Sequence, residues 1–261
     1  MMHLLDVHRS VAQARLREMV SFRADFLAGT LAVLTQQIIN LVFLSILFRH
    51  TSMIGGYGYS ESVLLFGLAM SVQSLSHIWF EGLHIIGPRH IERGELDLLL
   101  IRPGHPLLHI LSSHFQISGI LPFLLGVTIS VVALFHHAHA AFPLALFCLP
   151  FILFSGTLVI GGIILLAASL TFLFRRIRAI RRTVQSFEDT LFYPLDVFSP
   201  ALQTFLLTIL PFGWAAFGPS RFFLTGEIGW LLASLVAGPF FAVLGIALFN
   251  TLLPSYESTG T

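Results

Sequence analysis

The chain has 261 residues, of which 56% are hydrophobic and 10% are charged, and its formal net charge is +1. A mean hydropathy of +0.87 excludes an ordinary soluble domain, so we expect a single membrane domain over residues 1–261. All 14 basic residues are arginine, and the lack of lysine excludes a phosphate-binding loop, and hence an ATPase, on this chain, together with lysine Schiff-base chemistry.

The N-terminal residues are expected to lie on the membrane surface and not to be a cleaved signal peptide. Residues 1–25 mix apolar side chains with arginines, and the apolar run that follows is too long for the core of a signal peptide. Over 8–24 the pattern predicts an amphipathic helix in the membrane plane. A solvated lead-in helix is the alternative for the same residues.

An all-α bundle of six membrane-spanning helices is predicted, five of them from apolar runs at or near the ~20 residues that a helix needs to cross a bilayer. The spans are expected at about 26–48, 60–81, 106–135, 142–174, 183–198 and 228–253. The fifth is the least regular, because prolines interrupt the region around it. We expect a re-entrant outer hairpin over 200–216; the alternative makes 200–216 the span and leaves 183–198 at the inner surface.

The arginines predict the orientation in the membrane. All except Arg49 and Arg221 fall in the N-terminal segment, in the loop over 88–103 or in the cluster over 175–182. Because cytoplasmic loops are enriched in basic residues, the N- and C-termini and both arginine-rich loops are expected in the cytoplasm.

The polar segment 88–103, between the second and third spans, is expected to contact something on the inner side. Ile91 and Leu98 are seven residues apart, so they would share one face of a helix. The acids and arginines between them could then point toward water or a partner. Gly94 permits a sharp turn before Glu95. From the residues alone, a solvated loop that fixes the topology is an equal alternative.

Two polar faces interrupt the apolar spans. Helical spacing groups six candidate residues of a translocation path: Gln36, Gln37 and Asn40 in the first span, and Gln73, His77 and Glu81 in the second. Hydrogen bonding between neighbouring helices is the alternative explanation for these side chains.

Four stretches of the chain resemble the type-2 permeases of bacterial ATP-binding-cassette exporters, in a branch with six spans. They are SFRADFLAGT at 21–30, GYSESVLLFG at 58–67, IERGELDLLLIRPGHPLL at 91–108 and FYPLDVFSPALQTFLLTILPFGWAAFGPSRFFLTGE at 192–227. The GELD-x-LL-x-RP string is the most specific of them, and the GHP at 104–106 departs from the usual pattern of the branch.

The resemblance implies a transport subunit in the bacterial inner membrane that works by alternating access as a permease dimer, identical or paralogous. Separate ATPase subunits would bind ATP and Mg²⁺, so no cofactor is expected on this chain; membrane lipid is an expected partner and nucleic acid is not. In such permeases a coupling helix contacts the ATPase, a role that would fall on Ile91, Glu92, Arg93, Gly94, Glu95, Leu96 and Asp97.

Other classes of function stay open. A transporter driven by an ion gradient would bury ionisable residues at mid-membrane, and the centres of most spans carry none. An intramembrane metal enzyme would find its best support in His136, His137 and His139, but no carboxylate or cysteine lies near them in the sequence. We therefore expect no catalytic residue and no metal site. A purely structural membrane subunit is the third alternative.

Overall fold

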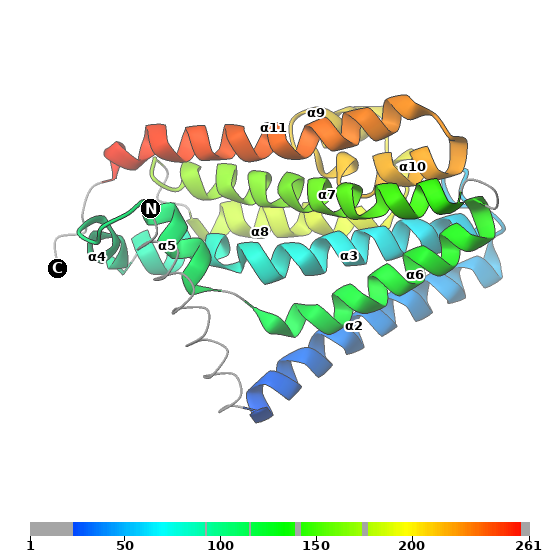
Figure 1. Ribbon diagram of the computed structural model, residues 1–261, viewed down its shortest axis with the longest axis horizontal. Coiled ribbons are helices and arrows are strands. Elements are labelled where there is room, and N and C mark those ends of the chain that lie inside the picture. Colours follow the sequence, from blue (N-terminus) through cyan, green and yellow to red (C-terminus); the bar gives the residue numbers. More distant parts are fainter. Residues whose placement is uncertain (1–22, 92, 115, 139–141, 174–176, 257–261) are drawn as a thin grey trace.

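The computed structural model describes residues 23–91, 93–114, 116–138, 142–173 and 177–256, shown as coloured ribbon in Figure 1. Over these ranges the chain is helical and contains no β-strand, which confirms the predicted all-α membrane bundle. The amphipathic helix expected over 8–24 falls almost entirely outside the described residues.

Within the described residues, five helical segments are long and apolar enough to cross a membrane. They are Ala28–His50 of α2 (Arg23–His50), α3 (Tyr59–His84), Ile117–His137 of η2 (Ile117–Gly119) and α6 (Ile120–Ala138), α7 (Phe142–Leu170), and Ile228–Ser255, which joins α11 (Ile228–Leu252) to the turn η7 (Leu253–Ser255).

Helices α3 and α7 form the centre of the bundle, and small residues let their neighbours approach closely. A Cβ on Gly67 of α3 would lie 2.7 Å from Ser130 Oγ of α6, and a Cβ on Gly126 of α6 would lie 2.7 Å from Ser71 Oγ of α3. Such contacts bring helix backbones together where longer side chains would separate them.

The packing of α7 against α11 is of the same kind and more extensive. A Cβ on Gly162 of α7 would lie 2.6 Å from the backbone of Phe241, and a Cβ on Gly238 would collide with the backbone and hydroxyl of Ser155. The Ser155 hydroxyl also donates a hydrogen bond of 2.6 Å to the carbonyl of Ser234 across the interface.

Helix α2 lies at the periphery. Only 11% of its apolar window is buried, against 72% for α7. Among its described side chains the buried ones are Thr30, Gln37 and Leu44, spaced seven residues apart, so a single narrow stripe of α2 faces the bundle. In Figure 1, α2 runs beside α6 and diverges from the remaining helices toward its beginning.

The expected span over 106–135 is wrong as one continuous helix. Residues Pro106–Ser113 form α5, and the chain then leaves the helix before η2 and α6. The break has a tertiary cause, since the Gln116 N–H donates to the Ile78 carbonyl of α3 over 3.2 Å. Next to it, a Cβ on Gly119 would lie 2.9 Å from the Ser74 carbonyl.

Residues 183–198 are likewise not one helix. Helix α8 (Ile177–Glu188) is followed by the turns η4 (Asp189–Phe192) and η5 (Leu195–Val197), separated by Pro194. Beyond them come α9 (Pro200–Thr208), η6 (Phe212–Trp214) and α10 (Phe217–Thr225). Pro194 follows η4 and Pro211 follows α9, and a proline cannot donate the hydrogen bond that would continue a helix. Pro200 is instead the first residue of α9, a position that needs no such bond.

Figure 1 shows α4 (Glu95–Leu100), α5 and the last turns of α11 at one end of the bundle, and α10 near the opposite end. We call the first the inner end and the second the outer end, following the arginine distribution. The 88–103 segment thus lies at the inner end, close to the end of α3 at His84.

Candidate functional site

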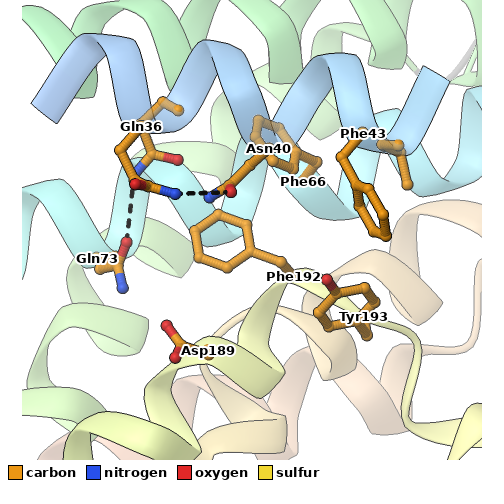
Figure 2. Close-up of a pocket in the computed structure, with 10 residues that line it drawn as sticks. Gln36, Asn40, Phe43, Phe66, Gln73, Asp189, Phe192 and Tyr193 are labelled. Carbon is orange, nitrogen blue, oxygen red and sulfur yellow. Dashed lines mark hydrogen bonds between the residues drawn. The ribbon is translucent and has the colours of Figure 1, made fainter. Parts of the chain in front are cut away.

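A cavity of about 480 Å³ lies between α2, α3 and η4, and Figure 2 shows the residues around it. Its walls combine amide side chains with aromatic rings and one carboxylate. The lining residues are Gln36, Gln37, Asn40, Phe43, Leu44, Phe66, Gln73, Asp189, Phe192 and Tyr193.

The amides of the cavity are held by hydrogen bonds. Gln36 Nε2 donates to Asn40 Oδ1 over 3.1 Å within α2, and Gln37 Nε2 donates to Gln73 Oε1 over 3.4 Å, which joins α2 to α3 (Figure 2). Gln37 is only 7% exposed. The structure therefore brings together four of the six path residues proposed from the sequence.

The other two path residues lie further along α3. His77 Nδ1 is 3.1 Å from Glu81 Oε2, one helical turn away, and neither residue lines the cavity. Sequence reasoning missed the third wall, made by Asp189, Phe192 and Tyr193. Asp189 directly follows Glu188, and this acidic pair was the available signal, but nothing in the sequence placed Asp189 in one cavity with residues of α2.

The polar segment 88–103 forms two elements and not one helix. A π-helical turn, η1, covers Ile86–Ile91, and α4 begins after Gly94, whose φ of 68° is left-handed. Glu92 lies outside the described residues. Leu96 is fully buried and fixes α4 to the bundle, while Arg93 is exposed and Glu95 and Asp97 are partly exposed. His90 is buried, with Nδ1 3.8 Å from Glu95 Oε2.

The exposed side of α4 is apolar. Leu98 is 56% exposed and Ile101, directly after the helix, is 81% exposed; Leu100 is also exposed. We call Leu98, Leu100 and Ile101 the inner apolar patch. Charged Arg93 and Arg102, both exposed, lie on either side of this patch in the sequence.

A histidine connects this end of the protein to α11. The Leu107 N–H donates to His105 Nδ1 over 3.2 Å, which caps the start of α5. Because Nδ1 accepts that bond, the neutral ring carries its proton on Nε2 and donates it to Asn250 Oδ1 over 2.8 Å. Nearby, burial raises the pKa of Tyr256, and the Asp97 carboxylate raises it further.

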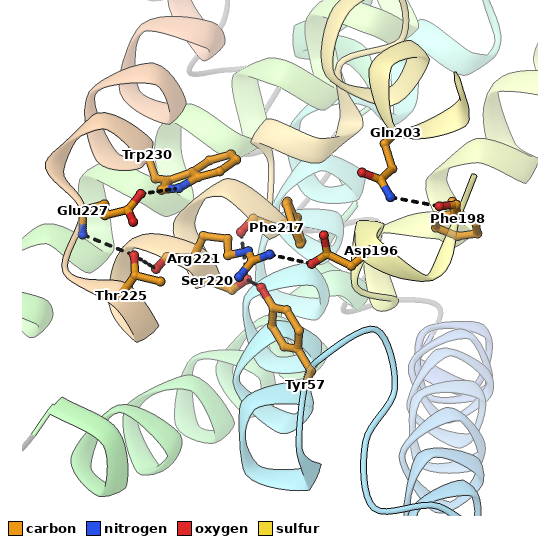
Figure 3. Close-up of polar contacts among 10 residues, drawn as sticks. All are labelled: Tyr57, Asp196, Phe198, Gln203, Phe217, Ser220, Arg221, Thr225, Glu227 and Trp230. Carbon is orange, nitrogen blue, oxygen red and sulfur yellow. Dashed lines mark hydrogen bonds and ion pairs between the residues drawn. The ribbon is translucent and has the colours of Figure 1, made fainter. Parts of the chain in front are cut away.

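At the outer end, Arg221 of α10 joins three elements (Figure 3). Its Nη2 lies 2.7 Å from Asp196 Oδ2 of η5, and its guanidinium lies 5.6 Å from the centre of the Tyr57 ring and 5.4 Å from that of Phe217. The Tyr57 hydroxyl is 3.2 Å from Ser220 Oγ. Burial raises the pKa of Tyr57, so its hydroxyl stays protonated and available for that hydrogen bond.

Two of the three histidines considered for an enzyme lie at the outer end of α6. His136 is exposed and His137 is partly buried, whereas His139 lies outside the described residues.

Comparison with known proteins identifies the protein family. A family model described as "ABC-2 family transporter protein" matches residues 34–260. The chain belongs to the ABC-2 transporter family. No curated protein matches it. The resemblance to type-2 permeases is thus confirmed, and the match includes all the site residues above.

As an ABC-2 family member the protein is a multi-pass membrane permease of an ABC transporter. Membership of this family implies association with ABC ATPase subunits and a transport permease without its own ATPase domain.

Proposed function

We propose that the protein is the membrane-spanning subunit of a bacterial ATP-driven exporter in the inner membrane. Two permease subunits, identical or paralogous, would enclose the translocation path by alternating access. Separate ATPase subunits would bind ATP and Mg²⁺ and drive the motion from the cytoplasmic side. The family match and the absence of lysine from the sequence support this assignment.

The observation that carries the proposal is the inner apolar patch. Leucine and isoleucine side chains exposed on a short helix, with arginines beside them, fit the apolar centre and polar rim of a protein interface. Leu96 is fully buried beneath them and holds α4 to the bundle. We therefore extend the expected coupling segment from 91–97 to Ile101, with the exposed side chains as the contact and Gly94 as the turn that presents them.

Force applied to α4 has a route into the bundle. The His105–Asn250 hydrogen bond and the proximity of Asp97 to Tyr256 connect the α4–α5 region to the end of α11. In this proposal, closure of the ATPases moves α4, and α11 follows because it is bonded to the same region.

The cavity between α2, α3 and η4 is proposed as part of the path. Phe43, Phe66 and Phe192 supply apolar walls, while Gln37 and Gln73 supply hydrogen-bonding groups. A mixed lining of this kind suits an amphiphilic cargo with both apolar and polar parts.

The experiment uses the full chain co-expressed with a candidate ABC ATPase subunit from the same organism. In Ile101→Glu, a charge replaces the most exposed side chain of the patch, and we expect ATPase co-purification to fall by more than tenfold. Met53→Glu is the matched control, because Met53 is 65% exposed at the outer end. Retention of the ATPase by a Leu98→Glu, Ile101→Glu double variant would contradict the docking site.

The driving force is tested in proteoliposomes. We expect ATP-dependent transport by permease plus ATPase, and none by the permease alone under a proton or sodium gradient. Gradient-driven transport by the pure chain would establish the secondary transporter instead.

A further inference from the structure

The inner half of α3 carries a cluster that lies outside both the lining of the cavity and the inner apolar patch, although two of its members were path candidates in the sequence. His77, Glu81 and His84 follow one another at steps of four and three residues and share one face of the helix. One potential ligand atom from each side chain lies within 4.8 Å of the other two. The His77 and His84 rings are stacked with centroids 6.1 Å apart, and His84 is buried.

Two imidazoles and a carboxylate are a ligand set typical of zinc, with nitrogen and oxygen bonds of about 2.0–2.2 Å. Tetrahedral bonds of that length place ligand atoms about 3.3 Å apart. His77 Nδ1 and Glu81 Oε2 are already separated by 3.1 Å. Small side-chain rotations would bring His84 to the same spacing.

A second observation comes from α8. Glu188, its last residue, is only 4% exposed, and its Oε1 has no hydrogen-bond partner among the described residues. The charged groups that act on its carboxylate include His77 and Glu81. Ionising a carboxyl group that is buried without a partner is costly, and a cation held by the α3 cluster would lower that cost.

We propose that His77, Glu81 and His84 form a site for a divalent transition-metal ion of the zinc class, whose charge the buried Glu188 carboxylate of α8 would help to balance. The ion would lie on α3, one helical turn from Gln73, on the inner side of the cavity. The site stands on this geometry alone and does not depend on which energy source drives transport.

Metal binding is measured on the full chain, purified in detergent without a histidine tag and treated with EDTA. We expect Zn²⁺ to bind at one equivalent in the micromolar range or tighter, and Co²⁺ to give the visible absorption of a four-coordinate site. His77→Ala and His84→Ala should each weaken binding by more than about tenfold, as loss of even an outer ligand does.

Glu81→Gln and Glu188→Gln keep side-chain volume and therefore test the same site with less risk to folding, which size-exclusion chromatography checks. Each should weaken Zn²⁺ binding and alter the Co²⁺ spectrum. His136→Ala is the control, an exposed histidine at the outer end of α6, and should leave both unchanged. Absence of a bound equivalent in the wild-type chain, or its retention in a His77→Ala, His84→Ala double variant, would overturn the proposal.

Discussion

His105 Nε2 donates a hydrogen bond to Asn250 Oδ1 over 2.8 Å, joining the start of α5 to the last turns of α11 across 145 positions of sequence. The two elements that this bond connects are a region proposed to receive force and a helix that crosses the membrane. A variant that lacks this hydrogen bond therefore tests whether the bond serves the stability of the fold or the coupling of ATP hydrolysis to transport.

Asn250→Leu should lower ATP-driven transport severalfold while changing thermal stability little, because one neutral hydrogen bond contributes about 0.5–1.5 kcal/mol. The measurement is transport per ATP hydrolysed in proteoliposomes. Thr251→Ala serves as the control, since the exposed Thr251 hydroxyl donates to the Ala247 carbonyl of its own helix. Equal coupling ratios in the two variants would rule out a role for the His105 bond.

Gly94→Ala should strain the turn before α4. The φ of 68° costs a residue with a Cβ about 1–2 kcal/mol, and asparagine tolerates this conformation better than alanine. We expect weaker ATPase binding in Gly94→Ala and partial recovery in Gly94→Asn. The reverse order in a co-purification assay would show that the turn does not present α4.

Gly238→Leu should prevent normal packing of α7 on α11. The new side chain would meet Ser155, and overpacking of a tight interface costs about 1–3 kcal/mol or more. Gly229→Leu on the same helix should be tolerated, because nothing lies within 4 Å of its Cβ position. Yield of folded protein and melting temperature by size-exclusion fluorescence distinguish them; similar losses in both would place the cause elsewhere.

The Arg221–Asp196 pair should contribute modestly to stability. Both side chains are about one-third exposed, at 34% and 32%, so the ion pair is worth about 0–1 kcal/mol, and stacking on Tyr57 and Phe217 adds about 0.5–1 kcal/mol. A double-mutant cycle of Arg221→Gln and Asp196→Asn measures the pair, and its coupling energy should fall as salt rises. A coupling energy of several kcal/mol would contradict this prediction and would mean that the ion pair is shielded from water.

Gln73→Leu should affect transport more than folding. It removes the hydrogen bond from Gln37, and such bonds between membrane helices average about 0.6 kcal/mol. It also replaces a polar wall of the cavity with an apolar one. Transport is compared with Thr128→Leu, an exposed position on α6 whose hydroxyl bonds within its own helix. A loss no greater than that of the control would remove Gln73 from the path.

The elements that could be predicted well from the sequence are the long apolar helices, whose composition is set by the lipid bilayer. Long apolar runs became α2, α3, α7 and α11, because the bilayer selects apolar side chains whatever the neighbouring helix is. The two polar faces could also be predicted from the sequence. Gln36 shares a helix face with Asn40, and Gln73 shares one with His77, because each pair is four residues apart.

The features that could not be predicted depend on contacts between distant parts of the chain. The break before α6 follows from the Gln116–Ile78 hydrogen bond, and an apolar run carries no trace of it. Asp189 reaches the cavity only because the chain turns at η4 after α8. His84 could have been predicted from the sequence as a member of the polar face on α3, because it follows Glu81 by three residues and so continues the series of Gln73, His77 and Glu81.

Backbone-to-backbone packing at Gly162 and Gly238 leaves no layer of side chains that would let α7 and α11 slide past each other. We therefore expect the pair to rotate or tilt as one rigid body, so that a displacement of Asn250 would move both helices together. We thus expect the central helix α7 to take part in any movement that begins at His105, although the hydrogen bond of His105 reaches α11.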